Sequence, residues 1–571
     1  MNIKEKLQQV IKQALQKLGI ESAGISLEFP ETLLHGDFST NIALIEAKKL
    51  GKNPKELAEE IKSHLETGSL SEVEKVEIAG PGFINFTLKK EFFAEEIKNI
   101  LKLDIDYGRS KKLKGQKTIV EYTDPNPFKE FHIGHLMSNT IGETLSRIIE
   151  WNGAEVRRAC YQGDVGLHVA KALWGIERIK DTKEKNKTEE VKFLGEAYAY
   201  GSDQYEQSDD VKKEIQEINK KVFDRTDEKI NTLYDWGRKV SLECFEGIYA
   251  KLGTKFDFYF FESETGKFGK KVVEENVGKV FEKGDKGAVV FKGENFDSKL
   301  HTRVFINSEG LPTYEAKELG LAKTKFETYP YERSVVITGN EVNDYFKVLL
   351  CALKQIFPDL AEKTVHKSHG MLRLPSGKMS SRKGNVITGE DLISQVEDLV
   401  KEKIADRDLD EDIKKEIAEQ VAVGAIKYSI LRQSIGRNII FDFEKSLSFE
   451  GDSGPYLQYA HTRANAVLLK AKDVGMAVKT DVPTEWNTSV LERMLSRFSD
   501  VVERAGEEYA PQYIVTYLTE LASVFNAWYA QEKIVDESNP ASPYKLALTS
   551  AFKVVMKNGL TILGIKTPER M

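Results

Sequence analysis

The spacing of apolar and polar residues predicts a small α+β unit at the start of the chain. Residues 1–20 place apolar side chains at helical spacing among charged ones, which predicts an amphipathic helix. A second helix is expected to begin at Pro54, because proline is favoured in the first turn of a helix. Residues 73–88 alternate apolar and polar positions, as strands do. We therefore assign residues 1–107 to an N-terminal α+β domain.

A different pattern begins after the basic segment 108–117. Residues 118–123 form an apolar run typical of a buried strand, residues 137–153 follow a helical period, and residues 155–164 again indicate a strand. A Pro-rich loop joins the first strand to the helix. This strand–loop–helix–strand order is the building block of a nucleotide-binding α/β sheet, and we place that domain at residues 115–400.

An insertion interrupts the α/β pattern. Residues from about 180 to 260 are rich in charge and follow a helical period, which predicts a helical insertion. Three later apolar runs, at residues 287–291, 302–307 and 334–340, are expected to resume the α/β pattern.

The pattern from residue 401 onward predicts helices almost throughout. We assign residues 401–454 to a helical connecting segment and residues 455–571 to a C-terminal α-helical bundle. The expected fold class is therefore multidomain α/β, with an N-terminal α+β domain, a nucleotide-binding domain that carries a helical insertion, and a helical end.

The amino-acid composition limits the class of protein and its expected location. The chain has 571 residues, of which 40% are hydrophobic, and this is enough to bury the cores of several domains. No apolar run is long enough to span a bilayer, and the first segment lacks the apolar stretch of a signal peptide. The three cysteines form no CxxC pair, which argues against a disulfide framework or a cysteine zinc site. We expect a cytoplasmic location and no membrane contact.

The sharpest local signal is His132-Ile133-Gly134-His135, between a predicted strand and a predicted helix. Ring nitrogens and free backbone N–H groups at the start of a helix can face the phosphates of a nucleotide. Gly134 has no side chain and would let an adenine ring lie against the backbone. Two histidines at this spacing also suit a metal pair or a helix cap, although no third metal ligand is evident nearby.

The second signal is the segment KMSSRKG, residues 378–384. Cations on a glycine-flanked loop suit the transient neutralisation of a leaving pyrophosphate. Taken alone, the segment also reads as a solvated basic loop. Its pairing with the histidine motif favours a nucleotide site.

The two motifs resemble the HIGH and KMSKS signatures of class I aminoacyl-tRNA synthetases. The segments at residues 36–61 and 77–86 resemble the additional N-terminal domain of arginyl-tRNA synthetases, and those at residues 441–468 and 558–571 are similar to the helical anticodon-binding domain of that family. The resemblance implies a Rossmann-type catalytic domain and the ATP-dependent ligation of L-arginine to tRNA(Arg). An arginyl-adenylate intermediate, with AMP and pyrophosphate as products, is implied as well.

The resemblance also implies roles for the residues of the two motifs. The implied catalytic residues are His132, His135, Lys378, Arg382 and Lys129. Ser381 stands where KMSKS has its second lysine, and Lys129 matches a lysine thought to compensate for that missing charge. The implied ATP-binding residues are His132, Gly134, His135, Met371, Lys378 and Ser380. The region of the first motif comprises Pro125, Asn126, Pro127, Phe128, Lys129, Glu130, Phe131, His132, Ile133, Gly134 and His135.

A pocket for arginine is implied by further matches to the family. A guanidinium is a planar fork of donors that pairs with carboxylates through two bonds at once, which selects against lysine. The implied arginine-binding residues are Glu121, Asn126, Tyr314, Glu318 and Glu341. Glu318 stands where the family usually has aspartate, so we expect a pocket altered by one methylene. For Glu341, a structural hydrogen bond is an equal alternative.

The implied partners are tRNA(Arg), L-arginine and ATP, with Mg²⁺ on the ATP phosphates and no protein-bound zinc. Arg432, Arg437 and Arg463 are candidate RNA contacts, with ordinary surface arginines as the alternative. The formal net charge of -7 argues against nonspecific coating of nucleic acid but leaves room for local basic patches. The family also implies a need for bound tRNA before activation, and a monomer is its default state.

Three alternative functions share some of these features. A cysteinyl-tRNA synthetase would have both motifs but would lack the N-terminal segments. A small-molecule adenylyltransferase would have an HxGH motif but would not be expected to have this helical end. A noncatalytic paralogue would keep the domains, and the presence of His132, His135, Lys378 and Glu121 argues against it.

Overall fold

The computed structural model describes residues 2–22, 24–30, 32, 35–65, 70–179, 187–374 and 388–571. The chain divides into two compact units. One unit comprises residues 1–107, 464–498 and 524–555, and the other comprises residues 108–463, 499–523 and 556–571. In the part of the chain that the structure describes, no helix has both the length and the apolar character needed to cross a membrane.

The first 107 residues form the predicted α+β fold. An antiparallel sheet with strand order β1-β3-β2 shares one apolar core with the surrounding helices. The elements of this region are α1 (Ile3–Lys17), β1 (Phe38–Thr40), α2 (Ile42–Leu50), α3 (Pro54–His64), β2 (Val73–Ala79), β3 (Phe83–Leu88) and α4 (Lys90–Leu103).

Local chemistry explains where these helices begin. Asn2 and Glu5 form a capping box at the start of α1, in which each side chain accepts a hydrogen bond from the backbone N–H of the other residue. Asn53 caps α3, and Pro54 occupies the first position, where its missing N–H has no intrahelical partner to lose. The predicted start of α3 is therefore confirmed.

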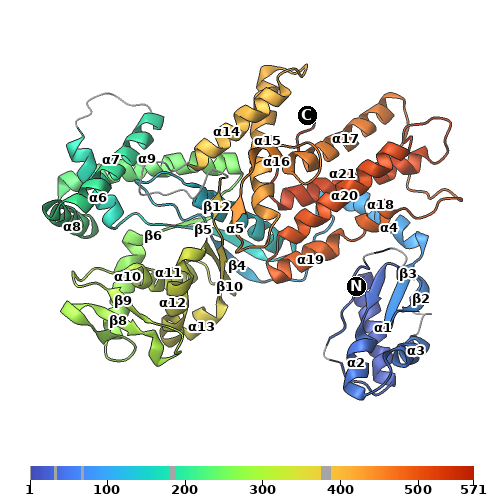
Figure 1. Ribbon diagram of the computed structural model, residues 1–571, viewed down its shortest axis with the longest axis horizontal. Helices are drawn as coiled ribbons and strands as arrows, with labels where there is room; N and C mark the ends of the chain where they lie inside the picture. Colours follow the sequence, from blue (N-terminus) through green and yellow to red (C-terminus); the bar gives the residue numbers. More distant parts are fainter. Residues whose placement is uncertain are drawn as a thin grey trace. The chain divides into compact units, whose positions relative to one another are not determined.

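The second unit is built on a five-stranded parallel sheet with strand order β11-β10-β4-β5-β6. The predicted strands at residues 118–123, 155–164 and 334–340 all belong to it. Figure 1 shows this sheet with α5 running alongside it. The strands are β4 (Lys117–Glu121), β5 (Glu155–Gln162), β6 (Phe258–Phe261), β10 (Arg333–Gly339) and β11 (Thr364–His369).

The helical insertion is present, but it ends before residue 260. Its helices share a core with α6 and form a cluster of their own, coloured teal to green in Figure 1. Residues 258–261 already form β6, which pairs with β5, so the last predicted residues of the insertion belong to the main sheet. The connecting helices are α5 (Ile133–Trp151), α6 (Leu167–Arg178), α7 (Lys187–Gln207), α8 (Asp209–Asp224) and α9 (Glu228–Leu252).

Two of the runs expected to resume the α/β pattern lie in a different sheet. Residues 287–291 and 302–307 contribute to an antiparallel sheet of β7 (Glu282–Lys283), β8 (Val289–Lys292) and β9 (Thr302–Ile306). The prediction was wrong for these runs because apolar alternation indicates a strand but does not choose its partner. The helices around this sheet are α10 (Glu262–Glu275), α11 (Tyr314–Thr328), α12 (Asn343–Ile356) and α13 (Pro358–Lys363).

The last part of the chain is helical, as the pattern predicts. A short parallel pair of β12 (Leu372–Arg373) and β13 (Ile439–Ile440) accompanies it. The helices are α14 (Gly389–Ile404), α15 (Glu411–Leu431), α16 (Phe443–Ser446), α17 (Gly454–Asp473), α18 (Val490–Leu495), α19 (Phe498–Glu508), α20 (Gln512–Gln531) and α21 (Ser542–Ile562).

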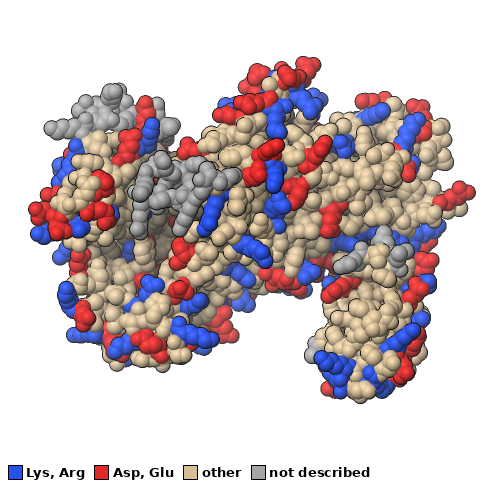
Figure 2. All heavy atoms as spheres, in the orientation of Figure 1, with Lys and Arg blue, Asp and Glu red and all other residues tan. Residues whose placement is uncertain are grey.

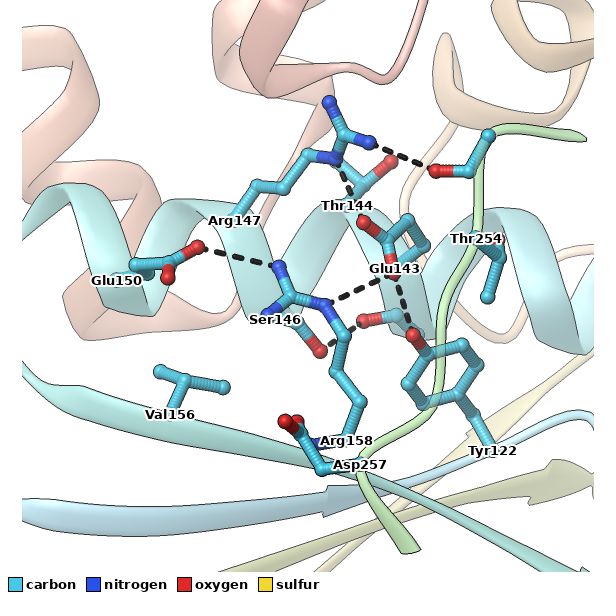
Figure 3. A network of polar contacts seen from close by, with 12 residues as sticks. Tyr122, Glu143, Thr144, Ser146, Arg147, Glu150, Val156, Arg158, Thr254 and Asp257 are labelled. Carbon is cyan, nitrogen blue, oxygen red and sulfur yellow. Dashed lines mark hydrogen bonds and ion pairs between the residues drawn. The ribbon is translucent and has the colours of Figure 1, made fainter. Parts of the chain in front are cut away.

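A buried polar network holds α5 against the sheet. Glu143 accepts hydrogen bonds from the Tyr122 hydroxyl at 2.5 Å, from Arg147 Nε at 2.7 Å and from Arg158 Nε at 3.1 Å. Figure 3 shows Glu143 between these three side chains, with Arg158 reaching on to Glu150. Removing one partner would leave a buried charge uncompensated, so the network fixes the position of α5.

Helix α5 also approaches the end of β4 closely. A Cβ atom on Gly142 would lie 2.1 Å from Cγ of Tyr122, whereas a Cβ on Gly247, in the exposed part of α9, would meet nothing within 4 Å. We expect Gly142→Ala to destabilise the protein by about 1–3 kcal/mol through overpacking. Gly247→Ala, the matched control, should instead stabilise it by about 0.5–1 kcal/mol through helix propensity. Thermal unfolding of both variants checks this, and equal shifts would contradict it.

Candidate active site

The order in which the chain adds strands reverses beside β4. We call the edge of the sheet at the carboxyl ends of β4 and β10 the crevice. From β4 the chain adds β5 and β6 on one side of the sheet, and then places β10 and β11 on the other side. The carboxyl ends of β4 and β10 are therefore neighbours, with Glu121 paired to Val336. Open parallel sheets bind ligands at such a point.

The loop that follows β4 has a strained backbone. Thr123, Asp124 and Phe128 have positive φ values of 82°, 47° and 67°, a region that residues with a Cβ rarely adopt. Side chains hold the loop in place: Ser138 Oγ accepts from the N–H of Thr123 at 3.0 Å, and Ser241 Oγ accepts from the N–H of Phe128 at 2.9 Å. Strain of this kind persists only where the surroundings enforce it, and it gathers at functional sites.

The two histidines of the first motif begin α5 and are hydrogen-bonded to its backbone. His132 is the N-cap residue, and its Nδ1 accepts from the N–H of Gly134 at 3.1 Å. His135 Nδ1 accepts from the N–H of His132 at 3.3 Å. The rings stack, with centroids 3.6 Å apart. Because both Nδ1 atoms accept, a neutral ring carries its proton on Nε2 and presents a donor.

Both rings are held in the neutral form. Burial first, and then the Lys129 charge, lowers the pKa of His132 to about 4. Burial, followed by His132, Lys129 and His369, lowers the pKa of His135 well below its ordinary value. A Cβ on Gly134 would lie 2.9 Å from the His132 ring, so the glycine permits this ring position. The pair therefore offers two N–H donors at a helix N-terminus, which favours an anion.

Glu121 lies at the end of β4 and forms a buried ion pair. Lys325, on α11, places its Nζ 2.5 Å from Glu121 Oε2 and 3.4 Å from Ser334 Oγ. Burial works to lower the pKa of Lys325, but the Glu121 charge raises it above its ordinary value. Glu121 therefore lies at the carboxyl end of β4 with a cation of the protein beside it.

A second buried ion pair joins Glu262 and Lys317. Glu262 begins α10 directly after β6, and Lys317 Nζ lies 2.6 Å from its Oε2. Lys317 Nζ also lies 5.1 Å from the ring centroid of Tyr314, which is 58% exposed. Glu262 has no counterpart among the residues predicted from sequence. The signal for it, a carboxylate after a strand-like run, was hidden because residues up to 260 read as an insertion.

The carboxyl groups of this crevice outnumber the cations that pair with them. Burial first, and then the Glu121 charge, raises the pKa of Asp124 and of Glu318 well above their ordinary values. Among the described residues, neither group has an ion-pair partner, whereas Glu121 and Glu262 each have a lysine. A ligand with cationic groups would favour the ionised form of both carboxyls, so the crevice suits such a ligand.

The remaining predicted residues of the crevice lie at its border. A Cβ on Gly163, after β5, would lie 2.2 Å from Asn126 Oδ1 and 3.5 Å from Glu262 Cδ, which places Asn126 beside the carboxyl cluster. Glu341 is exposed, and its carboxylate lies against Gly339 at the end of β10.

Other predicted residues lie near the first motif or outside the described part of the chain. Lys129 Nζ lies 5.0 Å from the ring centroid of Tyr198 on α7. Met371 is 37% exposed, and its N–H donates to Asn438 Oδ1 at 2.8 Å. The predicted residues Lys378, Ser380 and Arg382 lie outside the described residues.

Three family models match successive parts of the chain. A family model described as "tRNA synthetases class I (R), catalytic domain" matches residues 96–443. Models described as "Arginyl tRNA synthetase N terminal domain" and "DALR anticodon binding domain" match residues 5–88 and 457–571. The chain belongs to the arginyl-tRNA synthetase family.

Full-length relatives of the arginyl-tRNA synthetase family match as well. An arginine–tRNA ligase of Halothermothrix orenii is 30% identical over 576 residues, and one of Limosilactobacillus reuteri (strain DSM 20016) is 31% identical over 578 residues. Each alignment covers 100% of both chains. The fold is shared with the solved Thermus thermophilus arginyl-tRNA synthetase (TM-score 0.82, 23% identity, 100% of both chains). It is also shared with the Plasmodium falciparum enzyme (TM-score 0.80, 19% identity, 100% of this chain and 99% of the other).

The three candidate RNA-contacting arginines of this synthetase chain each have a contact within the protein. Arg432 forms an ion pair with Asp452, and the guanidinium of Arg463 lies 4.8 Å from the ring centroid of Tyr459. The carbonyl of Arg437 packs against Gly370, where a Cβ would lie 2.3 Å from it. Their proposed contact with tRNA stays a prediction.

The segment after β5 has a structural role that ties the insertion to the sheet. Asp164 is fully buried and accepts hydrogen bonds from Tyr234, Arg238 and Ser263. His168 Nε2 lies 2.8 Å from the Gly163 carbonyl oxygen, which makes it the donor. Burial, with smaller effects from Lys129 and other neighbours, lowers the pKa of His168 to about 3.

This buried histidine predicts a pH effect on stability. Its folded pKa of about 3 lies below the ordinary value of 6.5, so the unfolded chain takes up the proton first as pH falls. The stability of the wild type should fall relative to His168→Gln by about 1.4 kcal/mol for each unit below about pH 6.5. Denaturant unfolding of both proteins at several pH values measures the gap. A gap independent of pH would contradict the neutral assignment.

Proposed function

We propose that this chain binds arginine and ATP in the crevice at the carboxyl ends of β4 and β10, and ligates the arginine to tRNA. The observation that carries the proposal is the surplus of carboxyl groups over paired lysines. Arginine brings a guanidinium and an α-ammonium, and these would balance Asp124 and Glu318. The family assignment supplies the reaction, in which arginine is activated with ATP as arginyl-adenylate and then transferred to tRNA.

Activation joins a carboxylate oxygen of arginine to the α-phosphorus of ATP and breaks the bond to the β-phosphate, so that pyrophosphate leaves with the electron pair. Such a reaction depends mostly on positioning and on neutralising developing negative charge. We assign the triphosphate to the Nε2–H donors of His132 and His135, with Lys129 as a nearby cation. Lys378 and Arg382 keep their predicted role on the leaving pyrophosphate, and Mg²⁺ is expected to arrive on the ATP phosphates.

Recognition of arginine is assigned to the buried carboxyl cluster. A guanidinium pairs with carboxylates through two parallel bonds, which is a geometry that an ammonium cannot reproduce. Glu121, Glu262 and Glu318 approach the crevice from β4, α10 and α11, and the Tyr314 ring borders it. Asn126 lies beside this cluster and is assigned to the α-amino or carboxylate end of the substrate. Glu341, at the border, is assigned to the substrate as the weakest member of the set.

The tRNA is assigned to the parts of the chain outside the catalytic sheet. The matches to an N-terminal synthetase domain and to an anticodon-binding domain support this assignment. Acidic and basic side chains are interspersed over the face shown in Figure 2, so tRNA binding is expected to depend on local contacts such as Arg432, Arg437 and Arg463. The need for bound tRNA before activation, a monomeric state and a cytoplasmic location belong to the same proposal.

Pyrophosphate exchange with a panel of amino acids tests the proposed function. Radioactive pyrophosphate should enter ATP only with arginine, and only when tRNA is present. Lysine tests the guanidinium assignment, because it has the same charge without the planar fork. Exchange with another amino acid would mean that the assigned pocket residues recognise a side chain other than arginine. An absence of exchange would favour a noncatalytic paralogue.

The double role of His132 can be separated by substitution. In His132→Asn the amide oxygen can still accept from the N–H of Gly134, because asparagine is a good N-cap, but the Nε2–H donor is lost. We expect the rate of activation to fall about 10²–10³-fold with little change in Tm, as for the loss of one donor to a developing charge. His132→Ala should lose about 1 kcal/mol of stability in addition. Full activity of His132→Asn would show that the His132 ring serves only as a helix cap.

A further inference from the structure

Lys325 is a buried cation whose surroundings are those of the crevice. Its side chain comes from the last turns of α11, and it is 4% exposed. Its Nζ contacts one oxygen of Glu121, Oε2, and the hydroxyl of Ser334. A buried ion pair of this kind is seldom more stabilising than well-packed apolar residues of the same volume. Its presence therefore calls for a reason other than stability.

Lys325 changes the electrostatic balance around Glu121. The titratable groups that act on this cluster come from every element packed around it. Glu318 lies on α11, Asp124 follows β4, and Glu262 is on α10; the tyrosines nearby are Tyr161, Tyr331 and Tyr345. Without the ammonium, Glu121 would be a third carboxyl group with no cationic partner. A buried carboxyl in that position would compete for a proton, and its protonated form pairs poorly with a cation.

We infer that Lys325 is a positioning residue for arginine binding, which fixes Oε2 of Glu121 and leaves Oε1 as the acceptor for a cationic group of the substrate. The inference rests on the proposed function. It assigns Lys325 no contact with arginine, because Lys325 acts through Glu121. The neighbouring pair Glu262–Lys317 has the same form, with 2.6 Å between Nζ and Oε2. The two lysines lie on one helix, eight residues apart, and so on similar faces.

The first test is the pH dependence of KM for arginine, measured by tRNA-dependent pyrophosphate exchange. In Lys325→Gln, KM at about pH 7 should rise about tenfold or more, while kcat changes less than about threefold, because substrate binding loses an ionised acceptor. KM should recover toward the wild-type value as the pH is raised, since Glu121 then ionises without the lysine. Lys325→Arg should restore most of the affinity at neutral pH.

Lys545→Gln is the matched control. Lys545, on α21, is also buried and forms an ion pair with Glu532 at 2.5 Å. Its loss should lower Tm but leave the pH profile of KM for arginine unchanged. If Lys325→Gln behaves in the same way, the lysine is merely structural and the inference is overturned.

A double substitution keeps the test decisive if Lys325→Gln does not fold. Glu121→Gln leaves Lys325 as an uncompensated cation beside the substrate, so its KM for arginine should exceed that of Glu121→Gln/Lys325→Gln. The lysine substitution should lower KM in this second, Glu121→Gln background, a result that does not require Lys325→Gln alone to fold. A rise or no change in the second background would contradict the inference. An inactive wild type would count against the proposed function itself, which is a distinguishable outcome.

Discussion

The close packing of α5 on the end of β4 is the constraint on which the rest of the site depends. Gly142 leaves no room for a side chain beside Tyr122, and Glu143 is bonded to the hydroxyl of that same tyrosine. Tyr122 follows Glu121 in the chain. The contact therefore fixes the first turn of α5, with its two histidines, and the last residue of β4 at the edge of one crevice. A change of a few tenths of an ångström here would be transmitted to both, because a packed interior does not yield locally.

Two opposite electrostatic environments meet at this edge. At the start of α5, burial and a nearby lysine hold two histidines neutral, so they offer N–H donors where the helix favours an anion. Around the end of β4, burial and neighbouring carboxylates raise the pKa of Asp124, which follows β4, and of Glu318, on α11, so a cationic ligand would favour their ionised forms. One side thus suits the triphosphate of ATP and the other a dibasic amino acid. A reaction that joins the two needs both environments within reach of each other.

The family assignment excludes two of the three alternative functions. Membership of the arginyl-tRNA synthetase family, with matches to its N-terminal and anticodon-binding domains, excludes a cysteinyl enzyme and a small adenylyltransferase. A paralogue without catalysis would have the same fold. Two buried lysine–glutamate pairs and two further carboxyl groups in one crevice argue against it, because such an arrangement gains little stability over an apolar one.

The sequence by itself determined what depends on neighbouring residues. The helical period of α5, the apolar run of β4 and the histidines between them are local features, and they placed the nucleotide motif correctly between a strand and a helix. Glu121 was predicted from the family resemblance, and it lies at the end of its strand. Tertiary structure alone decided its partner, Lys325, which lies 204 residues away, and it brought Glu262 and Lys317 together from positions 55 residues apart. It also gave two strand-like runs to a separate sheet, because periodicity specifies a strand while its pairing depends on distant segments.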